Sequence, residues 1–305
     1  MKQLHIAILI PIHNGLAFTG KCLENITANL NHPHLNSNDF SVIVIDDGST
    51  DGSSQWMKNN YPQTVVLTGD GSLWWSGAIN KGIQYALNQA ATTHILMWNN
   101  DILIKNDYLL NLHQVLSQIP ANTVVGSKIY FADKPDVIWA MGGFFNRKTG
   151  NKNMYGMMQK DSSLYQSPLD ADWLPGMGTA ISRLVLEDIG LMDEINFPQY
   201  HGDSDYTLRA KLAGYPIVVF PNLRIWNDKS NSGMHHQNSL KRLLKSMDDI
   251  KSNYHIGKDI LFYHKYVSSP RAYMSLFKKY GSYIGGFIKW KILNFIGLKR
   301  RNTLN

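Results

Sequence analysis

Six aspartates in the sequence are candidates for binding a metal ion, and no matching nucleophile pair accompanies them. They are Asp46, Asp47, Asp70, Asp101, Asp203 and Asp205. Carboxylate oxygens suit Mg²⁺ or Mn²⁺, which proteins commonly bind through one or two carboxylates together with the phosphates of a substrate. A nucleotide diphosphate would complete such a shell, and the metal would stabilise the charge that develops on a departing diphosphate oxygen.

Motifs for several other chemistries do not occur in the sequence. The stretch "GDGSLW" has the first two glycines of a dinucleotide fingerprint but carries Trp74 where the third glycine should stand. The sequence also lacks a P-loop, a zincin motif and a nucleophile elbow. A Rossmann dehydrogenase is therefore disfavoured.

The aspartates belong to a recurring pattern in which polar residues follow an apolar segment. The segments and the residues after them are "LHIAILI" with "PIHN", "FSVIVI" with "DDGSTD", "TVVLT" with "GDG", and "THILMW" with "NND". Such segments alternate with helical patterns, which predicts a parallel sheet covered on both faces. Ligands bind beyond the carboxyl ends of the strands in sheets of this kind. Asn, Asp and Gly also make ordinary turns and caps, but that explanation is weaker for four successive strand ends than for one.

The predicted fold class is α/β, with a mostly parallel central sheet flanked by helices and a helical C-terminal appendage. After residue 125 the pattern loosens, because residues 146–170 are polar and lack periodicity, and we expect a loop there. The chain beyond Gly233 has a helical pattern. We expect one main domain over residues 1–233 and a basic, aromatic-rich helical tail over residues 234–305.

Composition bounds the setting in which the protein works. At 305 residues and 44% apolar content, the chain can bury a full core. The single cysteine, Cys22, excludes an internal disulfide and a cysteine-based zinc site, and it indicates a reducing compartment. The N-terminus lacks the features of a signal peptide, and no apolar run reaches the ~18 residues of a transmembrane helix. We therefore expect a cytoplasmic protein that does not span a membrane.

The net charge of +7 is unevenly distributed. Residues 234–305 contain 14 Lys and Arg against 3 Asp, a net of +11, while the rest of the chain carries 16 basic and 20 acidic residues, a net of −4. The tail interleaves aromatic and aliphatic residues with Lys and Arg, which favours an amphipathic helix on an anionic membrane surface. A helix packed on the main domain with a solvated basic face is the alternative. No nucleic acid is expected as a partner, because no recognised binding fold accompanies the charge.

Several motifs in order resemble the family 2 glycosyltransferases, a group of inverting enzymes with the GT-A fold. The motifs are "PIHNG", "VIDDGSTDGS", "LWWSGAINKGI", "MWNND", "WLPGMGTAISR" and "GDSDYTLRAKLAGY". The resemblance covers roughly residues 4–230, and the ordered set is more specific than any one motif. "LWWSGAIN" and "YTLRA" look most like the bacterial rhamnosyltransferase-like branch.

The resemblance implies that the first half of the chain binds a nucleotide-sugar donor. The residues that would contact the donor are Pro11, His13, Asn14, Asp46, Asp47, Gly77, Asn80, Asn99 and Asn100. The first three would lie beneath the nucleotide, and one of the two aspartates would accept a hydrogen bond from a ring N–H of the base.

The resemblance also implies a metal ligand and a general base. "NND" stands where the family has its metal-binding Asp-x-Asp motif, so Asp101 would be the ligand, with Asn99 in place of the first Asp. Asp203 matches the carboxylate of the family's Glu-Asp motif and would remove the acceptor hydroxyl proton, although Gly202 stands in place of the Glu. A further ligand after the last strand stays open among Asn227, Asp228, His235 and His236.

The segment "WLPGMG" is the expected acceptor side, with Trp173, Gly176 and Met177 as its contacts. Trp173 would either stack on an acceptor sugar or pack in the core, where aromatic residues are common. At least one residue of the pair Trp74 and Trp75 is expected to be a core residue.

Asp205 has a simpler interpretation than the other carboxylates. It stands four residues before Arg209 on an expected helix, a spacing that favours an ion pair.

Together these expectations describe a metal-dependent inverting glycosyltransferase. It would move a hexosyl- or rhamnosyl-type sugar from a nucleotide-diphosphate sugar to a glycan or lipid-linked acceptor in bacterial surface polysaccharide synthesis, such as O-antigen, other lipopolysaccharide or capsule. It would act on the inner face of the cell membrane. Two alternatives stay open. One is a catalytically silent nucleotide-sugar-binding scaffold, motivated by Asn99 and Gly202, and the other is a nucleotidyltransferase, which would need a basic loop after the first strand.

Overall fold

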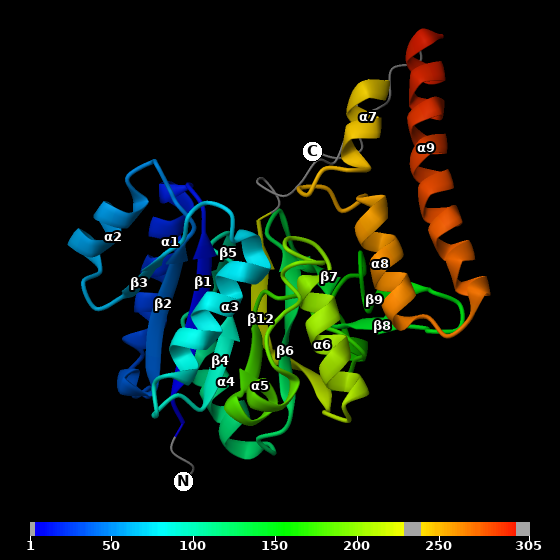
Figure 1. The fold of residues 1–305 in the computed structure, drawn as a ribbon. Helices are drawn as coiled ribbons and strands as arrows, with labels where there is room; N and C mark the ends of the chain where they lie inside the picture. Colours follow the sequence, from blue (N-terminus) through cyan, green and yellow to red (C-terminus); the bar gives the residue numbers. More distant parts are fainter. Residues whose placement is uncertain (1–3, 229–238, 297–305) are drawn as a thin grey trace. The chain divides into compact units, whose positions relative to one another are not determined.

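The computed structural model describes residues 4–228 and 239–296. The chain divides into two compact units. The sheet unit contains residues 1–144 and 153–232, and the helical unit contains residues 145–152 and 233–305. Figure 1 shows the elements of both units along the chain.

The first half of the sheet unit alternates strands and helices, as the sequence predicts. Its elements are β1 (Ile6–Ile12), α1 (Leu16–Leu30), β2 (Phe40–Asp46), α2 (Ser53–Asn60), β3 (Val65–Thr68), α3 (Trp74–Leu87) and β4 (His94–Met97). β1 pairs in parallel with β2 and β4, and β2 pairs in parallel with β3.

The second half of the sheet unit adds the antiparallel strands. Its elements are β5 (Ile102–Ile104), α4 (Tyr108–Gln118), β6 (Val124–Phe131), β7 (Lys134–Ala140), β8 (Gly143–Phe145), β9 (Lys152–Met154), β10 (Leu169–Asp170), β11 (Thr179–Ser182), α5 (Arg183–Ile189), α6 (Gly202–Leu212) and β12 (Ile217–Asn227). The main sheet has the order β10-β12-β6-β11-β4-β1-β2-β3, with β5 paired to β12 and β7 to β6. β11 runs antiparallel between β4 and β6, whereas the longest ladders, β1 with β2 and β6 with β12, are parallel. The expected α/β fold with a mostly parallel sheet is confirmed.

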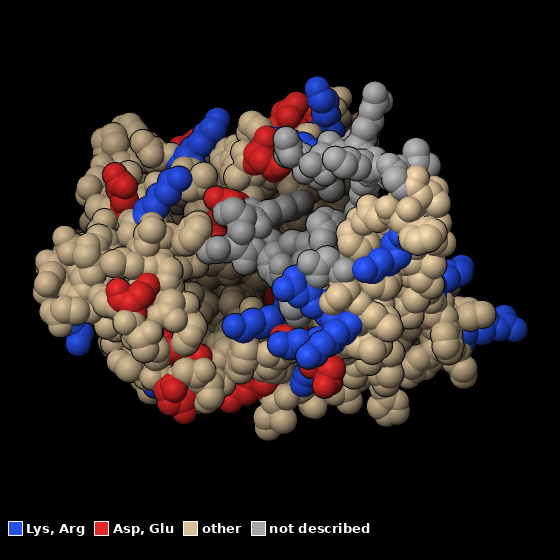
Figure 2. All heavy atoms as spheres, turned by 90° about the horizontal axis from the view of Figure 1, so that it is seen from above, with Lys and Arg blue, Asp and Glu red and all other residues tan. Residues whose placement is uncertain are grey.

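Alternate residues of β1 face opposite sides of the sheet and enter two hydrophobic cores. Ile8 and Ile10 pack with residues of α1 and α4 on one face, and Ala7 and Leu9 pack with residues of α3, α5 and α6 on the other. β1 is therefore buried on both faces, and polar residues follow it at the edge of the sheet. Figure 2 looks onto the edge toward which β1 runs.

The helical unit contains α7 (Leu240–Ser246), α8 (Ile256–Tyr266) and α9 (Tyr273–Phe295). Residues 145–152 pack against these helices, since the ring of Phe145 lies 5.4 Å from that of Phe262 and the Tyr263 hydroxyl donates to the Gly150 carbonyl at 2.5 Å. The expected C-terminal helices are confirmed, while the domain boundary at residue 233 stays a prediction. Within the described ranges, no helix combines the length and apolarity that crossing a membrane requires.

Candidate active site

The turn that carries "NND" follows a strand with no polar residue facing outward. Every residue of β4 is buried, and Trp98 after it is also buried and donates its N–H to the Leu9 carbonyl at 3.0 Å. The chain leaves the sheet at Asn99. Asn100 then donates from Nδ2 to the Thr19 hydroxyl at 3.1 Å, which fixes the turn to α1.

Asp101 is a predicted site residue whose carboxylate has a buried oxygen with no hydrogen bond in the described part of the chain. Its Oδ1 is buried and has no hydrogen-bond partner among the described residues. Burial, together with a smaller effect of the negative charge of Asp228, raises the pKa of Asp101 to about 6. Since buried polar atoms in proteins are nearly always hydrogen-bonded, this oxygen is a candidate for binding a cation.

Asp228 reaches Asp101 through the pairing of β12 with β5. Asn227 is in register with Ile102, and the Asp228 N–H donates to the Asp101 carbonyl at 3.2 Å. In the described part of the chain, no three His, Cys, Asp or Glu residues form a group that could hold a metal ion. A divalent ion at this pair would therefore need substrate oxygens to complete its shell. The other two candidates, His235 and His236, lie outside the described residues.

Asp203 lies in the first turn of α6, where a negative charge is favourable. Its Oδ2 accepts a hydrogen bond from the Gly176 N–H at 2.9 Å, and its Oδ1 accepts one from the Ser204 N–H at 2.7 Å. The structure thus brings the predicted general base into direct contact with the predicted acceptor loop. Met177 in that loop is half-buried, and the next residue, Gly178, donates its N–H to the Met97 carbonyl at the end of β4.

Trp75 connects this loop to the "NND" turn. A Cβ atom at Gly176 would lie 2.2 Å from Cζ2 of the Trp75 indole, so the ring lies directly against the glycine. The same indole donates from Nε1 to Oδ1 of Asn99 at 3.1 Å. One side chain therefore contacts both sequence segments, a role that the expectation of a core tryptophan missed.

Steric crowding explains why position 202 is a glycine. A Cβ atom at this position would lie 2.1 Å from the Ser76 hydroxyl, which donates to the Phe197 carbonyl at 2.6 Å. A larger side chain would displace Ser76. Ser76 of α3 therefore leaves room only for a glycine at position 202.

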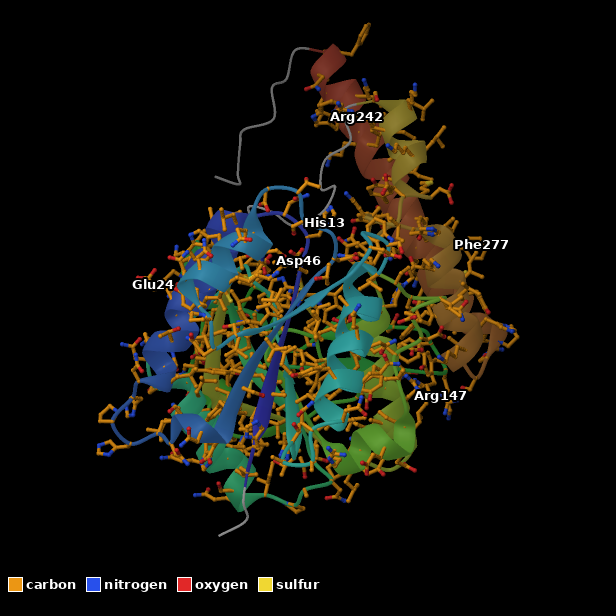
Figure 3. All side chains as sticks on the ribbon, turned by 60° about the vertical axis from the view of Figure 1, so that its left-hand side comes forward. His13, Glu24, Asp46, Arg147, Arg242 and Phe277 are labelled. Atoms are coloured by element: carbon orange, nitrogen blue, oxygen red, sulfur yellow. The ribbon has the colours of Figure 1, made fainter. Side chains whose placement is uncertain are left out.

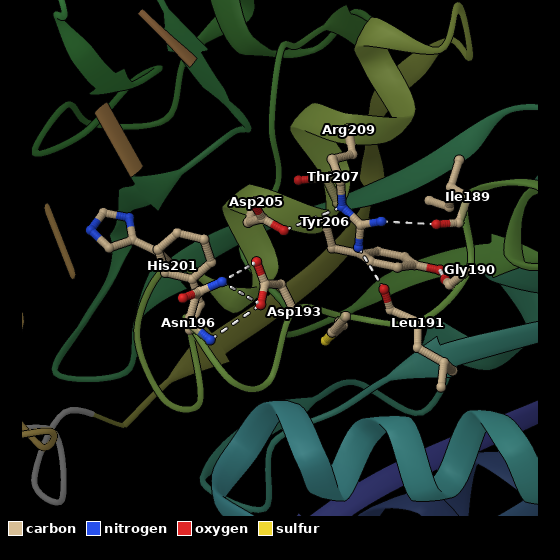
Figure 4. A network of polar contacts seen from close by, with 12 residues as sticks. Ile189, Gly190, Leu191, Asp193, Asn196, His201, Asp205, Tyr206, Thr207 and Arg209 are labelled. Atoms are coloured by element: carbon tan, nitrogen blue, oxygen red, sulfur yellow. Dashed lines mark hydrogen bonds and ion pairs between the residues drawn. The ribbon is translucent and has the colours of Figure 1, made fainter. Parts of the chain in front are cut away.

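Asp205 forms the predicted ion pair with Arg209, at 3.3 Å from Oδ2 to Nε. Arg209 also donates to the carbonyls of Ile189 and Leu191 at 2.8 and 2.6 Å, and Figure 4 shows these contacts together. Asp205 is fully buried. Asp205 thus holds Arg209, whose hydrogen bonds fix the segment between α5 and α6, and the predicted ion pair is confirmed.

Hydrogen bonds connect the loops that follow β1, β2 and β3, where several of the expected donor-binding residues lie. His13 donates from Nδ1 to the Asp47 carbonyl at 2.6 Å, because a carbonyl can only accept. In the neutral imidazole, Nε2 is then an acceptor. Asn14 accepts from the Thr50 N–H at 2.9 Å. The carboxylate of Asp47 accepts from the Gly71 N–H at 2.8 Å. Figure 3 shows His13 and Asp46 close together where β1 and β2 end.

Three other residues near the ends of β1, β2 and β3 have only local contacts or partial burial. Asp46 is buried, and its carboxylate accepts hydrogen bonds from the Ser49 N–H at 2.9 Å and from the Ser54 hydroxyl. Pro11 is half-buried within β1. Asp70 is exposed and bonds to Ser72 of its own turn, which lowers the pKa of Asp70. The donor contacts proposed for Asp46 and Pro11 stay predictions.

Asn80 and Gly77 face another part of the protein. Asn80 donates from Nδ2 to the Met192 carbonyl and to Glu194 at 3.0 and 2.6 Å, and its Oδ1 accepts from the Met192 N–H at 2.8 Å. A Cβ atom at Gly77 would lie 3.3 Å from Oε2 of the same Glu194. Both residues position the segment before α6, and both N–H groups of Asn80 are already used. The donor contacts expected of Asn80 and Gly77 stay predictions.

Trp173 is 4% exposed, and its ring lies against Gly143, where a Cβ atom would come within 2.1 Å of it. A ring that stacks on a sugar needs an exposed face. The packing interpretation therefore fits the structure, and the acceptor-stacking interpretation does not.

Comparison with known proteins decides the family. Residues 7–171, more than half of the chain, match the family described as Glycosyl transferase family 2. The chain belongs to glycosyl transferase family 2. This family 2 chain is similar to glycosyltransferase GlyA of Streptococcus pneumoniae serotype 4, with 21% identity over 236 residues. The match covers 73% of this chain and 32% of GlyA, so the chain spans about a third of that relative's length.

Two solved glycosyltransferases share the fold. The mannosyltransferase PcManGT from Pyrobaculum calidifontis, in complex with GDP-Man and Mn²⁺, has a TM-score of 0.57 at 15% identity, over 93% of this chain and 70% of that one. GalNAc-T7 with UDP, GalNAc and Mn²⁺ has a TM-score of 0.57 at 11% identity, over 90% of this chain and 56% of that one. The family 2 chain therefore has the GT-A fold.

Proposed function

We propose that this family 2 glycosyltransferase is an inverting, metal-dependent enzyme of the rhamnosyltransferase-like branch. It moves a hexosyl- or rhamnosyl-type sugar from a nucleotide-diphosphate sugar to a glycan or lipid-linked acceptor in bacterial surface polysaccharide synthesis. The buried, unpartnered Oδ1 of Asp101 carries the proposal, because it lies where the strands of the sheet end and next to a second carboxylate.

The residues around Asp101 fit a divalent cation, Mg²⁺ or Mn²⁺. The desolvated carboxylate of Asp101 would gain a partner, and the repulsion between Asp101 and Asp228 would be offset by the positive charge. These two residues would hold the ion together with the donor diphosphate, and the bound ion would stabilise the charge on the leaving group. Mn²⁺ in the structures of PcManGT and GalNAc-T7 supports this choice.

Asp203 is the proposed general base. Its hydrogen bonds to Gly176 and Ser204 orient the carboxylate, which would accept the proton of the acceptor hydroxyl. The hydroxyl oxygen then attacks the anomeric carbon as the bond to the diphosphate breaks, and this single displacement inverts the configuration. A carboxylate already held by two N–H groups loses little orientational freedom in this role.

Two further residues have hydrogen-bonding groups that would be available to the donor. The fixed tautomer of His13 presents an acceptor at Nε2, which suits an N–H of the base. Trp75 occupies Oδ1 of Asn99, which leaves the amide N–H groups of Asn99 for a diphosphate oxygen. The enzyme would act in the cytoplasm as a peripheral protein on the anionic inner face of the cell membrane.

A thermal-shift panel of nucleotide sugars with and without Mn²⁺ tests the function. We expect stabilisation by one donor that requires the metal and is lost in Asp101→Asn but kept in Asp136→Asn, a control on the exposed edge strand β7. Stabilisation without sugar transfer or donor hydrolysis would instead indicate the binding scaffold. A response confined to nucleoside triphosphates would indicate a nucleotidyltransferase.

A further inference from the structure

The longest helix of the chain, α9, exposes a continuous apolar stripe. The stripe consists of Met274, Phe277, Gly281, Ile284, Ile288, Ile292 and Phe295. These residues recur at intervals of three and four, so they share one face of the helix. The side chains at both ends are the most open, with Phe277 73% and Phe295 92% exposed. Figure 3 marks Phe277 on this helix.

The stripe is not used to fold the helical unit. A different face of α9 does that, since Leu276 and Tyr280 are buried and the Tyr280 hydroxyl donates to Asp259 at 2.6 Å. The ring of Tyr283 stacks on that of Tyr254 with centroids 3.7 Å apart. At Gly281 and Gly285, an added Cβ atom would meet nothing within 4 Å. Apolar surface of this extent and order is typical of an interaction site.

Lysines border the stripe on both sides. Helical geometry places Lys278 and Lys289, eleven residues apart, along one border and Lys291 along the other. The fourth lysine of α9, Lys279, is paired with Asp259 at 2.5 Å, so it belongs to the packed face. The sequence of α9 contains no Asp or Glu. The surface is thus apolar in the middle and positive at its edges.

We infer that the α9 stripe is the surface through which this protein lies on an anionic lipid bilayer. Two contributions stabilise a helix at a membrane surface. Apolar residues are buried at the boundary of the acyl chains, and lysines are attracted to anionic headgroups. A second copy of the chain fits less well, because residues 234–305 carry a net charge of +11 and two such segments would repel one another. The inference deepens the proposed function, since it names the surface where a lipid-linked acceptor would be met.

Vesicle co-sedimentation of the full chain tests the inference without requiring turnover. We expect binding to vesicles of phosphatidylcholine with phosphatidylglycerol and much weaker binding to phosphatidylcholine alone. Serine at Phe277, Ile288 and Ile292 together should abolish binding. Serine at Leu164, Leu184 and Leu212, which are exposed on the sheet unit, is the matched control and should leave binding unchanged. Replacing Lys278, Lys289 and Lys291 by Gln should weaken binding by about fivefold per lysine.

Two outcomes would overturn the inference, and a third would overturn only the proposed function. Equal binding of the stripe variant and the wild type would show that another surface meets the lipid. Dimers that disappear in the stripe variant, with no vesicle binding, would show that a second copy covers the stripe. Absence of sugar transfer alongside normal vesicle binding would reject the proposed function and leave the lipid surface standing.

Discussion

The indole Nε1 of Trp75 donates a hydrogen bond of 3.1 Å to Oδ1 of Asn99, and the same ring lies against Gly176. Gly176 in turn donates its N–H to Asp203 at 2.9 Å. A hydrogen bond, a van der Waals contact and a second hydrogen bond therefore connect the proposed donor side to the proposed base. The position of Trp75 at the start of α3 makes it the element that sets the spacing between them.

Trp75→Phe should lower the rate of sugar transfer by roughly tenfold to a hundredfold, because small misplacements of reacting groups are costly. Hydrolysis of the donor by water should fall less, since it does not need the acceptor loop. The ratio of transfer to hydrolysis measures this difference. Trp56→Phe, whose ring packs on Tyr61 away from these contacts, is the control and should leave the ratio unchanged.

Asp203→Asn should reduce transfer by about 10²–10⁴-fold, the usual contribution of a general base. The amide keeps an oxygen that can accept the Gly176 N–H, so the loop should stay in place. Donor binding measured by calorimetry should therefore be close to that of the wild type. Retained turnover in this variant would remove Asp203 from its role.

Asp101→Asn should stabilise the metal-free protein. Burying a carboxylate without a partner is unfavourable, and the neutral amide avoids both this cost and the repulsion from Asp228. We expect the melting temperature without metal to rise by a few degrees, on the order of 1 kcal/mol. The rise in melting temperature that Mn²⁺ with a donor gives to the wild type should be lost. A lower melting temperature without metal would contradict this reading of the site.

Gly202→Ala should destabilise the fold by about 1–3 kcal/mol, as overpacking typically does. The added methyl would lie 2.1 Å from the Ser76 hydroxyl. Ser76→Gly removes that hydroxyl, so adding it to Gly202→Ala should recover part of the loss. Urea unfolding of the single and double variants gives the coupling between them. Strictly additive losses would show that Ser76 is not what excludes a side chain at residue 202.

Cys22 should resist thiol reagents in the folded protein. Burial raises the pKa of Cys22 from 9.0 to about 12, so the reactive thiolate is scarce until the pH is far above the ordinary value. Modification at mildly alkaline pH should be orders of magnitude slower than in urea. A cysteine placed at the exposed neighbouring residue 21, in a Cys22→Ser background, should react rapidly and serves as the control.

The sequence predicts those parts of the site that depend on residues close together along the chain. The "NND" turn follows a fully buried strand, and Asp205 finds Arg209 one helical turn away, so both could be placed from spacing alone. Local sequence does not select Asp228, because its approach to Asp101 depends on an antiparallel pairing across more than a hundred residues. The partners of Asn80 at residues 192 and 194 are likewise invisible to local patterns.

The contacts of Trp75 and Ser76 are also not predictable from local sequence, for a physical reason. Aromatic and small polar residues at a helix start have many local explanations, including packing and capping. Their contacts to Asn99, Gly176 and Gly202 appear only after β11 and α6 are folded onto α3. The central alternation of strands and helices carried no such ambiguity, which is why the fold was more predictable than the site.

The chain passes into the helical unit twice, once at residues 145–152 and once after residue 232. Shortening the protein to its first 233 residues would therefore do more than delete a tail. Phe145, which is 5% exposed, would lose its contacts with the rings of Phe262 and Tyr263. The hairpin that carries Phe145 would then expose an apolar aromatic ring to water. A truncated version made for crystallisation should carry a polar residue at position 145, or it will be prone to aggregate.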